Sequence, residues 1–216
     1  MQYELKDNNI INLKGKILSE CKFDHEVYDE SFYTFFVETN RLSDSVDILP
    51  VTISKKLIDS NLLRIGNYVE ISGQIRSYNG FYDNKNKLIL TVFVRDIKQL
   101  SETEPQNKNP NQVTLNGYIC KKPIYRTTPF GREITDILLA VNRAYNKSDY
   151  IPCISWGRNA IFANKLNIGE NLLISGRMQS RIYQKKLENG EVEEKTAYEV
   201  SISKLEVLSK KHNINE

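Results

Sequence analysis

The stretch from Thr135 to Arg158 decides the fold and reads T-D-I-L-L-A-V-N-R-A-Y-N-K-S-D-Y-I-P-C-I-S-W-G-R. Residues 137–141 form an apolar run rich in branched side chains, and residues 150–156 form a second extended run. Between them, residues 142–149 are rich in Asn, Ser and Asp, which favour turns because their short polar groups bond to nearby backbone. We predict two β-strands joined by a polar turn.

The second run carries two aromatic residues on one side. Side chains alternate between the faces of a strand, so Tyr150, Ile154 and Trp156 share a side. The opposite side carries Ile151, Cys153 and Ser155. Both sides hold apolar residues, so alternation alone does not decide which one faces the core. Aromatic rings between arginines suit a single nucleic-acid strand, because bases stack on rings while cations meet phosphates.

The composition indicates a folded protein of one or two domains. The chain has 216 residues, of which 40% are hydrophobic and 26% charged. The three cysteines are far apart and form no C-x-x-C pair, which argues against a disulfide framework or a zinc site. We see no secretory signal and no apolar run long enough to cross a bilayer, so we expect a cytoplasmic protein without a membrane partner.

The two halves of the chain repeat each other. At an offset of 102, Gly15 matches Gly117, and the matches continue through Asn40-Arg41, Asp47 and Pro50. At an offset of 103, matches follow at Ile65-Gly66, Gly73 and Ser77. Such a near-constant offset indicates a duplication, and repeats of this kind define an architecture.

Each copy shows the same predicted order of five strands, with a helix between the third and fourth strands. The helices are expected at 56–63 and 159–166, where apolar residues fall at helical spacing. This order is the plan of an OB-fold, a small barrel whose outer face and loops bind oligonucleotides or oligosaccharides. We therefore predict an all-β chain with two tandem five-stranded OB-fold barrels.

A polar segment with two prolines, residues 101–111, reads as a linker. It separates an N-terminal OB-fold at 1–100 from a second at 112–208, followed by a short tail at 209–216. The first hundred residues carry 13 Lys and Arg against 14 Asp and Glu, and the remainder carries 17 against 13. The second half is therefore the better partner for a polyanion.

The second half resembles a bacterial single-stranded DNA-binding protein. The resemblance rests on N-G-Y-I (116–119), P-I-Y-R-T-T-P-F-G (123–131), L-A-V-N-R (139–143), Y-I-P-C-I-S-W-G-R (150–158), L-N-I-G-E (166–170), I-S-G-R-M-Q-S-R-I-Y (174–183) and A-Y-E-V-S-I (197–202). It implies single-stranded DNA binding without sequence preference in replication, recombination and repair. It also implies an assembly of four OB-folds. Because this chain contains two OB-folds, a homodimer would supply four.

The resemblance places base-stacking aromatics at Tyr150, Trp156 and Tyr183, with Tyr145 as a weaker match in the turn. Basic residues of the second half are candidates for phosphate contacts. They are Arg126, Arg132, Arg143, Arg158, Arg177, Arg181 and Lys185. A solvated surface is the ordinary role of any single Arg or Lys, so these residues carry weight only as a group.

The first half departs from the pattern, because Ile48 stands in place of Tyr150 and Ser54 in place of Trp156. We expect it to bind DNA more weakly or to serve assembly. Weaker contacts would come from Arg41, Arg76, Tyr78 and Tyr82. The end of the chain, S-K-K-H-N-I-N-E, is neither acidic nor apolar at its tip, unlike the tail with which many family members recruit replication and repair proteins.

The sequence shows no catalytic constellation, and we predict no enzyme activity, no cofactor and no metal. Only two histidines occur, His25 and His212, and neither is paired in sequence with a nucleophile or a ligand set. Two other functions stay open at this point. One is a primosome-type OB-fold that binds protein partners more than DNA, and the other is an RNA-binding OB module.

Overall fold

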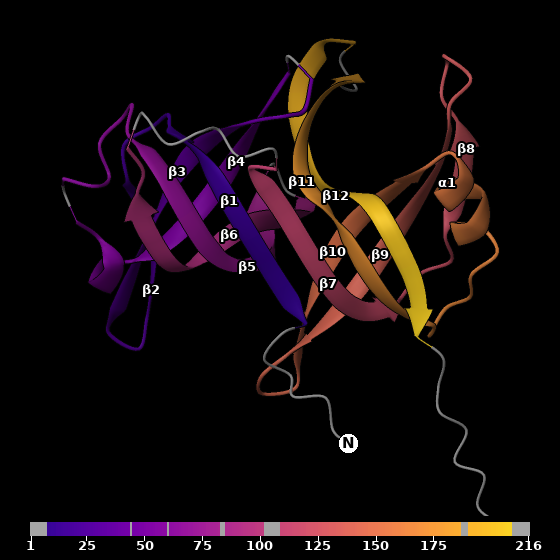
Figure 1. The fold of residues 1–216 in the computed structure, drawn as a ribbon, viewed down its shortest axis with the longest axis horizontal. Coiled ribbons are helices and arrows are strands. Elements are labelled where there is room, and N and C mark those ends of the chain that lie inside the picture. Colours follow the sequence, from indigo (N-terminus) through magenta and orange to yellow (C-terminus); the bar gives the residue numbers. More distant parts are fainter. Residues whose placement is uncertain are drawn as a thin grey trace, which may run out of the picture. The chain divides into compact units, whose positions relative to one another are not determined.

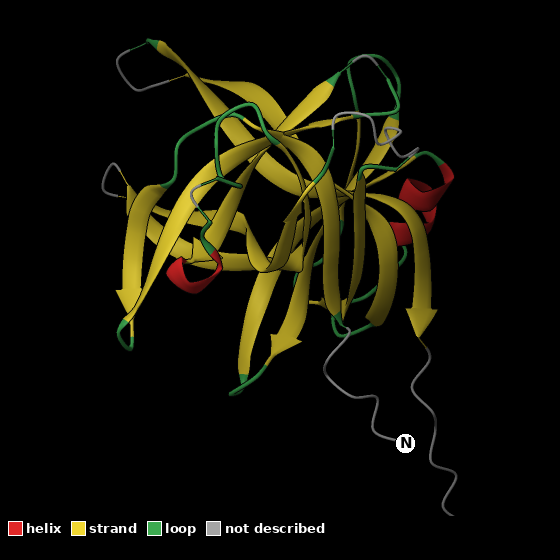
Figure 2. Ribbon diagram, turned by 60° about the vertical axis from the view of Figure 1, so that its left-hand side comes forward, coloured by secondary structure: helices red, strands yellow, loops and turns green. Residues whose placement is uncertain are grey.

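The computed structural model describes residues 8–43, 45–59, 61–82, 85–101, 109–186 and 190–208. The expected tail at 209–216 and residues 102–108 of the expected linker lie outside this part. Strands dominate, and helical segments are short (Figure 2). The strands are β1 (Asn9–Ile17), β2 (Lys22–Val27), β3 (Glu30–Asn40), β4 (Val46–Ser54), β5 (Tyr68–Tyr82), β6 (Lys85–Gln99), β7 (Asn111–Ile119), β8 (Ile124–Thr127), β9 (Glu133–Arg143), β10 (Lys147–Trp156), β11 (Asn171–Lys186) and β12 (Val192–Leu208).

The chain divides into two compact units (Figure 1). We call Ile10–Gln112 with Met178–Glu199 the N-terminal unit. We call Met1–Asn9, Val113–Arg177 and Val200–Glu216 the C-terminal unit. The far ends of β11 and β12 therefore group with the first half of the sequence.

Strand pairing closes a ring in the N-terminal unit. β1 pairs with β3, β3 with β4, β4 with β6, β6 with β5, and β5 again with β1. The pairing of β4 with β6 is parallel, and the other four are antiparallel. β2 is added outside this ring, as a hairpin with β3.

The C-terminal unit repeats this connectivity. β7 pairs with β9, β9 with β10, β10 with β12 in parallel, and β11 with β7. β11 and β12 are neighbours in the sheet, and β8 forms a hairpin with β9 in the position that β2 has beside β3. We did not predict β2 and β8 from the sequence, because every residue of both strands is exposed and neither strand has a buried apolar side.

The core follows the repeat seen in the sequence. Leu13, Val37 and Leu49 are fully buried in the N-terminal unit, and their partners at an offset of 102 are Leu115, Leu139 and Ile151, which are also fully buried. Gly15 and Gly117 hold the same place in their rings. A Cβ atom at Gly15 would collide with the carbonyl oxygen of Glu38, and one at Gly117 would lie 2.6 Å from that of Ala140. Close approach of backbones thus explains this repeated glycine.

The two expected helices differ in the structure. In the C-terminal unit α1 (Arg158–Ala163) buries Ala160 and Ala163, and Thr135 Oγ1 donates a hydrogen bond to Ala160 O at 2.8 Å. In the N-terminal unit a 3-10 turn, η2 (Lys55–Leu57), stands in place of the helix that we expected at 56–63. The Asp59 side chain accepts a bond from Asn61 N at 2.8 Å, a local turn that competes with helix formation.

Candidate nucleic-acid interface

The aromatic residues of β10 point away from the core. Tyr150 is 46% exposed and Trp156 is 37% exposed, whereas Ile151, Cys153 and Ser155 on the opposite side of the strand are buried. Ile154 shares the outer side but is buried, because it lies between Asp136 of β9 and Ser201 of β12. The structure thus resolves which side of this strand faces outward: the side with the rings.

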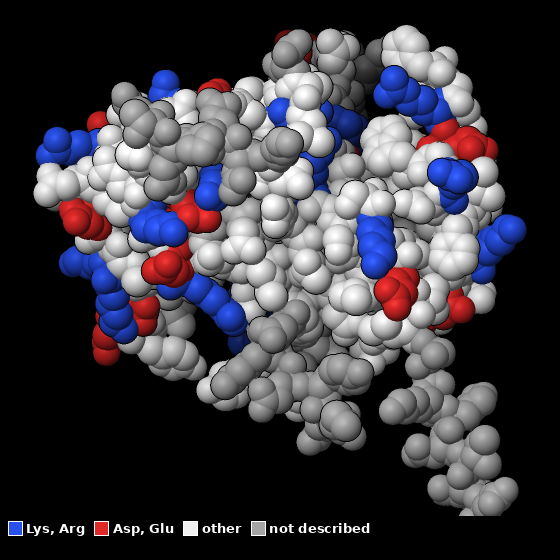
Figure 3. Space-filling model, viewed as in Figure 1, with Lys and Arg blue, Asp and Glu red and all other residues white. Residues whose placement is uncertain are grey.

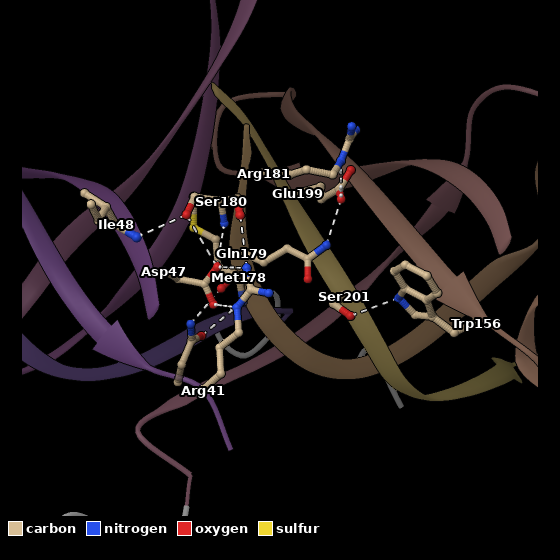
Figure 4. A network of polar contacts seen from close by, with 11 residues as sticks. Arg41, Asp47, Ile48, Trp156, Met178, Gln179, Ser180, Arg181, Glu199 and Ser201 are labelled. Atoms are coloured by element: carbon tan, nitrogen blue, oxygen red, sulfur yellow. Dashed lines mark hydrogen bonds and ion pairs between the residues drawn. The ribbon is translucent and has the colours of Figure 1, made fainter. Parts of the chain in front are cut away.

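The indole of Trp156 is fixed by one hydrogen bond. Its Nε1 donates to Ser201 Oγ at 3.2 Å, across to β12 (Figure 4). Trp156 lies six positions after Tyr150, about 20 Å along an extended strand, so the two rings would stack on different bases. A ring that is held in place and half exposed loses little freedom when a base covers it.

A third outward aromatic, Tyr118, lies in line with Tyr150. Tyr118 of β7 is opposite Ala140 of β9, and Ala140 is opposite Tyr150 of β10. Directly opposed residues share a face, so the three form one row, which we call the tyrosine row. Tyr118 is 41% exposed. Adjacent strands are about 4.8 Å apart, so two rings stand about 10 Å apart across the small Ala140 side chain.

We did not predict Tyr118 as a binding residue, although the alternating pattern of β7 indicates its outward position. Val113, Leu115 and Ile119 alternate with polar residues, and this pattern places Tyr118 on the outer face. An aromatic residue on the polar side of a strand is a candidate for binding, because burial does not explain it.

Two of the expected phosphate-binding arginines are held by carboxylates. Arg126 donates two bonds to Asp136, from Nε at 2.8 Å and from Nη2 at 3.1 Å. Arg143 Nη1 lies 3.5 Å from Asp149 Oδ1, and that carboxylate is buried. Exposed ion pairs contribute little to stability, so the Arg126 side chain can exchange its partner for a phosphate at a small cost.

The other candidates of the C-terminal unit lie at the ends of its strands and helix or on β11. Tyr145 stands at the tip of the β9–β10 turn, with a φ of 60° and 94% exposure. Arg132 precedes β9 and Arg158 opens α1, and both are exposed. Arg177 is half-buried near the middle of β11.

Three candidates belong to the N-terminal unit, because they lie between Met178 and Glu199. Tyr183 is part of β11. The Arg181 guanidinium lies 5.9 Å from the centre of the Tyr183 ring, and its Nε lies 3.4 Å from Glu199 Oε1. Lys185 is exposed.

Arg41 has a structural role in the N-terminal unit. It donates to both carboxylate oxygens of Asp47, at 2.9 and 2.6 Å, and to Ser180 O at 3.1 Å (Figure 4). Asp47 also accepts a bond from Ser180 N at 2.8 Å, and Ser180 Oγ accepts one from Ile48 N at 3.1 Å. The hydrogen bonds to Asp47 raise the pKa of the Arg41 guanidinium. This network joins β4 to the far part of β11.

The remaining weaker candidates lie on β5. Arg76 is half-buried on β5, and Tyr78 on the same strand is 44% exposed. The side chain of Tyr82 lies outside the described part of the structure. Ile48, in the place of Tyr150, is 41% exposed, whereas Ser54, in the place of Trp156, is buried and donates to Glu30 Oε1 at 2.5 Å.

Charges on the surface are mixed. On the face shown in Figure 3, basic and acidic side chains are interspersed and no large area has a single sign. Among the described residues, no three His, Cys, Asp or Glu side chains gather as they would around a metal ion. No helix in the described ranges has the length and apolar character needed to span a membrane.

Comparison with known proteins shows that residues 110–208 match the single-strand binding protein family. A single-stranded DNA-binding protein of Clostridium tetani is 39% identical over 83 residues, which are 35% of this chain and 57% of that protein. Single-stranded DNA-binding protein A of Bacillus subtilis is 37% identical over 81 residues, 34% of this chain and 47% of that protein. The chain spans about half the length of the curated relatives it matches.

The fold has a counterpart among solved structures. The crystal structure of the wild-type single-stranded DNA-binding protein from Thermus aquaticus superposes with a TM-score of 0.73. The alignment covers 94% of this chain and 93% of that one, at 19% sequence identity. At this identity the likeness concerns the fold alone.

Proposed function

We propose that this chain, whose residues 110–208 match the single-strand binding protein family, belongs to that family and binds single-stranded DNA without sequence preference. Its relatives from Clostridium tetani and Bacillus subtilis are named single-stranded DNA-binding proteins. Binding would coat and protect single strands during replication, recombination and repair. It would require no chemical step, cofactor or metal.

The observation that carries this proposal is the outward position of Tyr150 and Trp156 on β10. A residue exposed by a third to a half keeps part of its ring open, and every base offers a flat face to such a ring. Stacking on an aromatic side chain contributes about 1–3 kcal/mol per base and tolerates any sequence. Tyr118 adds a third ring through the tyrosine row.

Phosphate contacts would come from the basic residues around this face. Arg132 and Arg158 are exposed, and Arg126 can turn from its exposed partner Asp136 toward a phosphate. Arg143, paired with the buried Asp149, remains a proposed contact. Each neutralised phosphate makes the affinity fall more steeply with salt. Tyr145, Arg177, Tyr183, Arg181 and Lys185 remain proposed contacts.

We also propose that each ring of five strands is an OB-fold and that the domains are those expected from the sequence, 1–100 and 112–208. Support comes from the shared pairing order of β1, β3, β4, β5 and β6 with β7, β9, β10, β11 and β12. A homodimer would bring four such folds together. The mass of the assembly in solution tests this part of the proposal.

The decisive experiment compares wild type with Tyr150→Ala/Trp156→Ala, by anisotropy of a labelled oligo(dT). Ile48→Ala is the matched control, because Ile48 holds the place of Tyr150 in the N-terminal unit and is similarly exposed. We expect tight, salt-dependent binding by wild type and by the control, and a strong loss in the double variant. Equal affinities in all three would reject the proposal.

Competition with RNA of the same length separates the remaining candidates. Preference for RNA would favour an RNA-binding OB module. A folded protein that binds neither nucleic acid would favour a primosome-type assembly role.

A further inference from the structure

A second set of flat side chains lies on the outer face of the N-terminal unit. The His25 and Phe32 rings stack with centres 5.0 Å apart and planes 17° apart. Phe32 meets Phe93 at 5.7 Å, and the Arg76 guanidinium lies 5.7 Å from the centre of the Phe93 ring. These four residues, the aromatic ladder, join β2, β3, β6 and β5.

The aromatic ladder occupies the place that Trp156 has in the other unit. Phe32 is directly opposite Ser54, and the corresponding pair in the C-terminal unit is Ile134 opposite Trp156. Equivalent cross-strand pairs therefore carry a large ring in both units. The ring comes from β3 in the N-terminal unit and from β10, the equivalent of β4, in the C-terminal unit. Phe93 likewise takes the place of Ser201: Thr52 pairs with Phe93, as Ile154 pairs with Ser201.

We propose that the aromatic ladder is a second stacking site for bases of single-stranded DNA, and this rests on the proposed function of the C-terminal unit. The His25 side chain is 46% exposed, so its face away from Phe32 is open to a base. Phe32, Phe93 and Arg76 are half-buried. Bases stack on histidine and phenylalanine rings, so a base on the outer face of His25 would continue the ladder.

Nearby carboxylates repel the phosphates of a nucleic acid only weakly, because they already accept hydrogen bonds or form ion pairs. Asp24 Oδ2 bonds to His25 Nδ1 at 2.7 Å. Glu30 Oε2 accepts a bond from Lys56 Nζ at 2.7 Å, and the bonds from Lys56 and Ser54 lower the pKa of Glu30. Since Lys56 is already paired with a carboxylate, the contribution of the ladder is expected to depend less on salt than that of the C-terminal unit.

The test uses the full-length protein and a single-stranded oligo(dT) that carries 5-iodo-deoxyuridine. Photocrosslinking followed by peptide mapping is expected to mark His25 or Phe32 in addition to Tyr150 or Trp156. Crosslinks at Tyr150 or Trp156 without any at the ladder would overturn this inference and leave the proposed function standing. Crosslinks at neither place would count against both.

Affinity gives a second, independent measure. Phe32→Leu/Phe93→Leu removes both rings and leaves a large apolar side chain at each position. We expect it to weaken binding of a long oligo(dT) by about fivefold or more, with the quenching of Trp156 fluorescence unchanged. Tyr28→Ala is the control, because Tyr28 is 99% exposed in the same β2–β3 hairpin and outside the ladder. A change in the mass of the assembly with no change in DNA affinity would assign the ladder to protein contacts and reject the inference.

Discussion

On the C-terminal unit the row across three strands is Tyr118, Ala140 and Tyr150, whereas on the N-terminal unit the equivalent row is Lys16, Glu38 and Ile48. The backbone pairing is the same in both. One row offers two rings on either side of a methyl group, and the other offers a cation, a carboxylate and an aliphatic side chain. Duplication has thus preserved the frame and left the outer face free to change.

The contrast continues on the neighbouring strands. In the N-terminal unit Glu70 lies 3.2 Å from Lys14 and 2.8 Å from Lys98, an ion triad on the outer face. In the C-terminal unit Asn116 and Leu173 hold the places of Lys14 and Glu70, so no charge stands there. At these two positions the same strand pairing therefore carries an ion pair in one unit and uncharged side chains in the other.

The largest expected effect comes from removing the exposed rings of the C-terminal unit. Tyr150→Ala/Trp156→Ala removes two stacking rings, which together contribute about 2–6 kcal/mol. The affinity for oligo(dT) should fall at least about thirtyfold, measured by anisotropy at constant salt. Circular dichroism should show the fold intact, because both rings face outward. Unfolding of this variant would mean that the rings belong to the core.

Tyr118→Ala tests whether the tyrosine row acts as a unit. One stacked base contributes about 1–3 kcal/mol, so the affinity should fall about fivefold or more in the same titration. Lys16→Ala is the matched change in the N-terminal unit. A loss from Lys16→Ala as large as that from Tyr118→Ala would contradict the difference between the two rows.

The alternation of side chains along the predicted strands predicted part of the outer face of the C-terminal unit but not all of it. Alternation grouped Tyr150 with Trp156 correctly, yet Ile154 on the same side made the direction ambiguous. The ambiguity arises because two neighbouring strands cover Ile154, a fact of pairing that no local pattern contains. The sequence also did not predict that Phe32 supplies the ring opposite Ser54. Residues 32, 33, 35 and 36 are all aromatic, so they place rings on both faces of β3.

The duplication was the most informative feature of the sequence, since it predicted which residues would take equivalent positions. Where the copies diverge, local chemistry decides. Apolar residues have helical spacing at 56–63 and at the equivalent 159–166, but the turn at Asp59 limits the N-terminal unit to η2. The position of residues 178–199 depends on Asp47 and Ser180, which are far apart in sequence, so composition and spacing did not predict it.

A smaller effect concerns the cores. Thr39 Oγ1 is buried without a hydrogen-bond partner, and its counterpart Val141 is fully buried. Thr39→Val removes an unsatisfied hydroxyl at nearly constant volume, so the free energy of unfolding should rise by about 1 kcal/mol. Denaturant unfolding measures this. The reverse change, Val141→Thr, should destabilise the protein, and a stabilisation by it would show that the two sites are not equivalent.

The smallest effect tests the ion triad. Hydrogen bonds from Lys98 and Lys14 lower the pKa of Glu70 below its ordinary value. A carboxylate with a lowered pKa in the folded protein contributes stability above its unfolded pKa, and this contribution is lost as the pH falls through the lowered pKa. Glu70→Gln should therefore flatten the acid side of a plot of Tm against pH. An unchanged profile would mean that the triad contributes nothing.

The central claim is that Trp156 lies open to bases on the outer face of the C-terminal unit. Trp156 is the only tryptophan in the chain, so its fluorescence reports on this site alone. Titration with oligo(dT) at low salt should quench the emission, and added salt should restore it. Emission that does not change while the oligonucleotide is bound would show that DNA binds elsewhere, and this result would contradict the account.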